Sequence, residues 1–91
     1  MDTSRDAALA TEIRAEAGRQ RITKRAHALA AGVAHSTANR KLNGEVAIDL
    51  DDLEAFARVL RIEPGELVAR AYSAALAAAT GTDDSVSLTR R

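Results

Sequence analysis

Two short helix-forming stretches separated by one glycine constrain this chain more than any other feature. The first stretch follows Thr23, a good N-cap residue, and meets Gly32 after about eight residues. A tight connection follows, and the second stretch ends at Asn43 and Gly44, which both tolerate the left-handed conformation that terminates helices. Two helices joined by a short glycine-containing turn form a helix-turn-helix unit, which we place at about residues 23–43.

Helical periodicity predicts three further helices and no strand. One begins at Thr3 or Ser4 and ends near Gly18. Asp49 caps another over 50–60, and Pro64 opens a last, extended helix that continues to about Thr80. The expected core combines the stripe Leu50, Leu53, Phe56, Ala57 and Leu60 with Leu9, Ile13, Val33, Leu42 and Leu67. We therefore expect an all-α, five-helix domain over residues 1–80 and a disordered polar tail over 81–91.

Composition and charge narrow the class of protein. The 91 residues make one small domain, and the lack of cysteine excludes disulfides, thiolate zinc sites and a thiol nucleophile. The longest apolar run, 74–79, is far too short to span a membrane, and the N-terminus does not resemble a secretory signal. Residues 14–44 hold seven basic side chains against one acid, whereas 45–69 hold seven acids against two arginines. A basic segment of this kind is expected of a protein that binds a polyanion.

The segments "ITKRAHALAAGVAHSTANRKLNG" and "IDLDDLEAFARVLRIEPGEL" carry a family resemblance. Over about residues 9–68 the chain resembles the Cro/CI-type (lambda-repressor-like, XRE) helix-turn-helix family of phage and bacterial transcriptional regulators. The resemblance implies a lambda-repressor-like DNA-binding domain. In that family the second helix of the motif lies in the major groove of double-stranded DNA.

The resemblance also implies which residues touch DNA. The base-reading positions correspond here to His35, Ser36, Asn39 and Arg40. An arginine can pair with guanine O6 and N7, and an asparagine with adenine N6 and N7, so these residue types suit the role. The phosphate-contacting positions, which hold the register without reading sequence, correspond to Lys24 and Asn43. We expect further phosphate contacts from the Thr23 and Thr37 hydroxyls and from Arg25 or Lys41.

Two of the departures from the family pattern concern single positions of the helix-turn-helix unit. His27 stands where the family has a buried aliphatic residue, and we expect a histidine at the edge of the core, hydrogen-bonded to backbone. If the helix rotates, Leu29 fills part of that space. Ala34 stands where serine or threonine commonly caps the recognition helix, so that Ser36 or the turn backbone must compensate.

Enzyme chemistry finds no support in the sequence. The two histidines, His27 and His35, fall on opposite sides of the predicted turn, and no zinc-protease motif, nucleophile elbow or glycine-rich phosphate loop is present. We predict no catalytic residue, no metal site, no cofactor and no small-molecule ligand.

The sequence thus predicts a cytoplasmic, sequence-specific DNA-binding regulator, a repressor of phage or prophage type. Two alternatives stay open: an antitoxin-like DNA binder of a toxin–antitoxin pair, and a protein-interaction module that engages a regulator or polymerase. The extended last helix carries apolar residues on several sides, so we expect a homodimer with Tyr72 and Leu76 in the contact, or packed back on the first helix to help form it. The alternative is that this helix only covers its own core and frays after Ser73.

Overall fold

The computed structural model describes the backbone of residues 3–79 and the side chains of residues 5–77. Five helices account for most of this part of the chain, and no strand occurs in it. They are α1 (Thr3–Arg19), α2 (Lys24–Ala31), α3 (His35–Leu42), α4 (Leu50–Leu60) and α5 (Pro64–Ala79). The all-α, five-helix prediction is confirmed; the predicted disordered tail at 81–91 lies outside the described residues. Within residues 3–79, no helix combines the length and apolarity that a membrane crossing requires.

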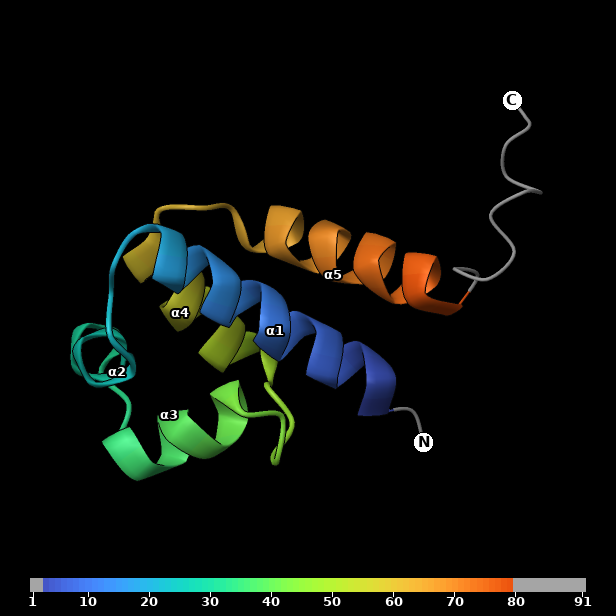
Figure 1. The fold of residues 1–91 in the computed structure, drawn as a ribbon. Coiled ribbons are helices and arrows are strands. Elements are labelled where there is room, and N and C mark those ends of the chain that lie inside the picture. Colours follow the sequence, from blue (N-terminus) through green and yellow to red (C-terminus); the bar gives the residue numbers. More distant parts are fainter. Residues whose placement is uncertain (1–2, 80–91) are drawn as a thin grey trace.

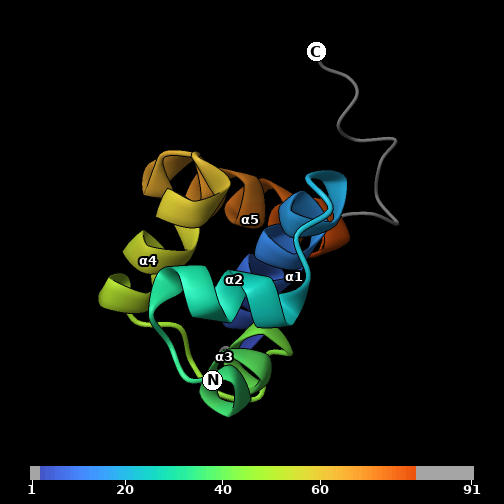
Figure 2. The same ribbon diagram turned by 90° about the vertical axis from the view of Figure 1, so that its left-hand side faces the viewer.

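The long helices α1 and α5 lie side by side, and the helix-turn-helix pair α2 and α3 packs at one end of α1 (Figure 1). In the rotated view α2 lies across the molecule just above α3, with α4 beside it (Figure 2). The recognition helix α3 is therefore at the periphery. Its inner side rests on α1 and α2, and its outer side is open.

The core lies where these helices meet. Phe56 and Leu60 of α4 pack with Ile13, Leu42 and Leu67, and each of these five side chains is at most 1% exposed. These residues were all predicted to be core residues, as was Leu53, which is also buried, while Leu9 and Val33 pack against the core from its edge. Leu50 was wrongly assigned to the core: it is 76% exposed, because it is the first residue of α4 and the buried part of that helix begins only at Leu53.

Four helices are followed by a residue in the same left-handed backbone conformation. At Arg21, Gly32, Gly44 and Arg61 the chain turns with a positive φ of 61° to 81°. The next residue then bonds back to the last turn of the helix, as in Ile22 N–H to the Ala17 carbonyl at 2.8 Å. Helix α1 therefore ends at Arg19 rather than at Gly18. An arginine instead of a glycine takes the left-handed position, and Ile22 re-enters the core behind it.

Candidate DNA-binding surface

The turn between α2 and α3 fixes the angle of the recognition helix. Thr23 caps α2 by accepting a hydrogen bond from the Ala26 N–H at 3.1 Å, and Gly32 ends it with φ 76°. Val33 N–H then bonds to the Ala28 carbonyl at 3.0 Å, so the turn is closed by backbone groups. At the start of α3, Ala34 has no side-chain cap, which leaves the first N–H groups of the recognition helix open on the surface.

Four contacts hold α3 from its inner side. Ala38 and Leu42 are buried against the core. The guanidinium of Arg14 in α1 donates to the Leu42 carbonyl at the end of α3, and the Lys41 ammonium pairs with Asp52 of α4. Sequence reasoning missed the Arg14 and Asp52 contacts because both join residues with no fixed spacing in the chain.

The capping of α4 sets the position of Asp52. Asp49 accepts from the Asp52 N–H at 2.8 Å, and Asp52 accepts from the Asp49 N–H at 3.3 Å, which completes a reciprocal capping box. The N–H of Asp52 is also the main reason why the pKa of Asp49 lies below its usual value. The cap that starts α4 thus also anchors the last turn of α3 through Lys41.

The predicted base-reading residues share the outer face of α3. His35, Ser36 and Arg40 are exposed, and Asn39 is half-buried between them and α2. Positions 35, 36, 39 and 40 recur at helical spacing, so their side chains project from one side of the helix. The structure therefore brings all four onto a single open surface.

Lys24 joins the two helices of the motif. Its ammonium donates to Asn43 Oδ1 at 2.7 Å and lies 3.4 Å from Asn39 Oδ1. Three residues predicted from different stretches of sequence are thus in contact. Of the other predicted phosphate contacts, Thr23, Arg25 and Thr37 are exposed, whereas Lys41 is half-buried in its ion pair with Asp52.

His27 occupies the interface between α2 and α4. Its side chain is fully buried, its Nε2 lies 3.1 Å from the Phe56 carbonyl, and the two rings meet edge to face at 5.1 Å. The predicted hydrogen bond to backbone is confirmed. Leu29 does not fill this space; it is 81% exposed, because α2 points it away from α4. It lies instead over a hollow of about 330 Å³ whose lining includes Arg25, Val33 and His35.

No group of three or more histidine, aspartate or glutamate side chains in the described part of the chain is arranged to hold a metal ion. The chemistry that the surface offers is hydrogen bonding and positive charge. Arginine, lysine and asparagine side chains on an open helix match the base edges and phosphates of a DNA groove.

Comparison with known proteins agrees with this geometry. Searches of curated proteins and of solved structures gave no significant match. A family model for the Cro/C1-type helix-turn-helix DNA-binding domain matches residues 12–71, which include α2, α3 and α4 entirely. The chain therefore belongs to the Cro/C1-type helix-turn-helix DNA-binding family.

Proposed function

We propose that this chain is a transcriptional regulator that reads a double-stranded DNA operator with α3, as a repressor of phage or prophage type in the cytoplasm of a bacterial cell. The contact of Lys24 with Asn43 at 2.7 Å is the observation that carries the proposal. It places a cation from the start of α2 at the edge of the exposed polar face of α3. A DNA backbone that follows this edge meets Lys24 while the bases meet α3.

Reading of the bases rests on the outer face of α3. Arg40 donates to guanine and Asn39 pairs with adenine, with His35 and Ser36 nearer the start of the helix. Since Asn39 Oδ1 lies 3.4 Å from the Lys24 ammonium, Lys24 orients the Asn39 amide as well as contacting phosphate.

Phosphate contacts set the register. Thr23, Arg25, Thr37 and Asn43 are exposed and can reach the backbone directly. Lys41 contributes when its ammonium turns away from Asp52, so its contact is the weaker one.

Two substitutions distinguish a residue that reads bases from a residue that contacts phosphate. The operator is first selected from a random DNA pool, and binding is then measured by fluorescence anisotropy at two salt concentrations. Arg40→Ala should weaken cognate binding by about 1–3 kcal/mol and relax the preference at one base position. Lys24→Ala should weaken binding to all sequences alike and lower the salt slope by roughly one unit per half-site.

Arg19→Ala is the matched control, because it removes the same charge from the end of α1, where Arg19 pairs with Glu16. Equal losses in all three variants would mean that only net charge matters. An unchanged selected sequence for Arg40→Ala would show that α3 is placed in the groove in a different register.

We also propose that a second copy contacts Tyr72 and Leu76, so that two α3 helices read half-sites about one DNA turn apart. Tyr72 is 54% exposed with the Arg5 guanidinium 5.1 Å from its ring centre, and Leu76 is 66% exposed. Sedimentation of the full chain against one ending at Ser73 tests this. If both remain monomeric at high micromolar concentration and bind DNA equally, the extension has no role in assembly. A toxin held on the same surface is the alternative, and co-purification with the product of an adjacent gene would favour it.

A further inference from the structure

The outer face of α4 carries an ordered set of charges that neither the core nor the DNA-binding surface uses. Leu50, Asp51, Glu54, Arg58 and Arg61 are all exposed. On a helix of 3.6 residues per turn Leu50, Asp51, Glu54 and Arg58 fall within an arc of about 100°, and Arg61 follows as the residue that ends α4. Along this α4 stripe the order is one apolar residue, two acids and two arginines.

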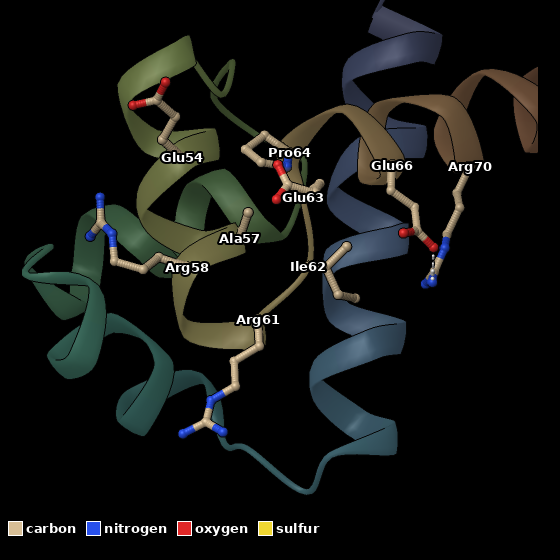
Figure 3. Close-up of a pocket in the computed structure, with 9 residues that line it drawn as sticks. All are labelled: Glu54, Ala57, Arg58, Arg61, Ile62, Glu63, Pro64, Glu66 and Arg70. Atoms are coloured by element: carbon tan, nitrogen blue, oxygen red, sulfur yellow. Dashed lines mark hydrogen bonds and ion pairs between the residues drawn. The ribbon is translucent and has the colours of Figure 1, made fainter.

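These charges have no ion-pair partner among the described residues. Glu54 and Arg58 are spaced to pair along the helix, yet no bond joins them, and in Figure 3 their side chains extend from α4 without meeting. By contrast Glu66 and Arg70, with the same spacing on α5, are bonded at 2.6 Å (Figure 3). The helix dipole favours acids at the start of α4 and arginines at its end. The helix dipole does not explain why these acids and arginines lie on one exposed face, nor why Leu50 beside them is 76% exposed.

A hollow lies beside the stripe. It has a volume of about 670 Å³ between α4 and the start of α5, and Ala57, Ile62 and Pro64 form the apolar part of its lining (Figure 3). Arg58 and Arg61 stand at its edge. The acidic end of the stripe carries the exposed Leu50, and the basic end borders this hollow, whose apolar part is flanked by charged side chains.

We propose that the α4 stripe is a contact between two copies of this chain, packed antiparallel about a two-fold axis. A two-fold contact must be self-complementary, and reversing the stripe places acids opposite arginines. In one register Glu54 faces Arg58 of the second copy, Asp51 faces Arg61, and Leu50 enters the hollow at Ile62. Each pair occurs twice because of the symmetry.

This contact goes beyond DNA binding and does not depend on it. None of the stripe residues is a proposed DNA contact, and none lies on α5. A chain with self-contacts on both α4 and α5 can link one dimer to another, so the stripe suits cooperative binding at neighbouring operators.

Charge exchange tests the proposal in the full chain, with circular dichroism as the check on folding. Glu54→Arg and Arg58→Glu should each raise the dissociation constant for self-association by about tenfold or more, because like charges then face each other. A mixture of the two variants, and the double variant that carries both changes, should associate as the wild type does, because each restores opposite pairs. Rising salt should weaken the wild-type contact. Glu45→Arg, with the same charge change on the loop before α4, should associate normally.

The measurement is sedimentation equilibrium, made also in a chain carrying Tyr72→Ala and Leu76→Ala, so that association through α5 cannot conceal the effect. Three results would overturn the proposal: a monomeric wild type at high micromolar concentration, single variants that associate unchanged, or a mixture that associates no better than either variant alone. DNA binding measured in parallel keeps failure of this contact distinct from failure of the proposed function.

Discussion

The stability of this domain should fall as the pH drops from 7 to 5, and His27 should be the cause. Its imidazole is fully buried, with Nε2 donating to the Phe56 carbonyl. Its other ring nitrogen, Nδ1, is buried and has no hydrogen-bond partner among the residues that the structure describes, so the proton of an imidazolium finds no acceptor among them. Burial is the main reason why the pKa of His27 lies below its usual value of 6.5, and the bond to Phe56 only partly opposes it.

The direction of this change in stability with pH follows from proton linkage. In the unfolded chain His27 takes up a proton as the pH falls through about 6.5, whereas the folded state resists protonation, so the unfolded state gains the advantage. The free energy of unfolding then decreases with a limiting slope of about 1.4 kcal/mol per pH unit. If the folded imidazole stayed neutral throughout, the loss between pH 7 and 5 would be about 2 kcal/mol. That is a large share of the stability of a domain this small.

Urea unfolding of the wild type and of His27→Gln at several pH values between 7.5 and 5 measures this effect. Glutamine keeps an N–H donor for the Phe56 carbonyl but does not titrate, so its curve should be flatter over this range. His35→Gln removes the exposed histidine and should follow the wild type. Parallel curves for the wild type and His27→Gln would refute the reasoning, since His27 would then bind its proton equally well in both states.

Three further predictions concern stability. Phe56→Ala should lower the free energy of unfolding by about 3–5 kcal/mol, because it empties the centre of the core, while Leu29→Ala at an exposed site should change it by less than about 0.5 kcal/mol in the same denaturant assay. Arg21→Gly should raise the stability by about 0.5–1 kcal/mol, because glycine adopts a φ of 61° without strain; a lower melting temperature would contradict this. Bonds from Gln20 and Arg19 lower the pKa of Glu16 to about 2, so the stability that Glu16 provides is present above pH 4.5 and is lost as the pH falls toward 2. The stability difference between wild type and Glu16→Gln should therefore shrink over that range.

The sequence was sufficient to predict the five helices because their ends are determined locally. Thr23 and Asp49 are caps that bond to N–H groups three residues later, and Gly32 ends α2 by its own conformation. The exceptions are Arg21 and Arg61, which take the left-handed position that normally selects glycine. No local preference of arginine predicts this, because the turn is stabilised by the apolar residue that follows each arginine and packs on the core.

Side-chain exposure was predicted less well at two leucines, Leu50 and Leu29. Leu50 fits the apolar spacing of α4, yet it precedes Leu53, the first buried residue of that helix. Leu29 could not be placed from its spacing in α2, because the direction of that helix depends on His27 meeting Phe56 on α4. Both errors concern which face of a helix meets a distant partner, and that is a tertiary property.

The candidate site shows the same division between local and distant contacts. The outer face of α3 could be predicted because residues at helical spacing share a side, and because a binding face must be free of core contacts. What holds α3 in place is distributed over α1 and α4, through Arg14 and Asp52. In the proposed mode of binding, the residues that read DNA therefore contribute little to folding, and Arg14 and Asp52 position the helix without contacting the bases. It follows that substitutions at His35, Ser36 and Arg40 should alter sequence preference with stability nearly unchanged, whereas Arg14→Ala should destabilise the domain and weaken binding to all sequences. A melting temperature that falls as much for Arg40→Ala as for Arg14→Ala would refute this separation.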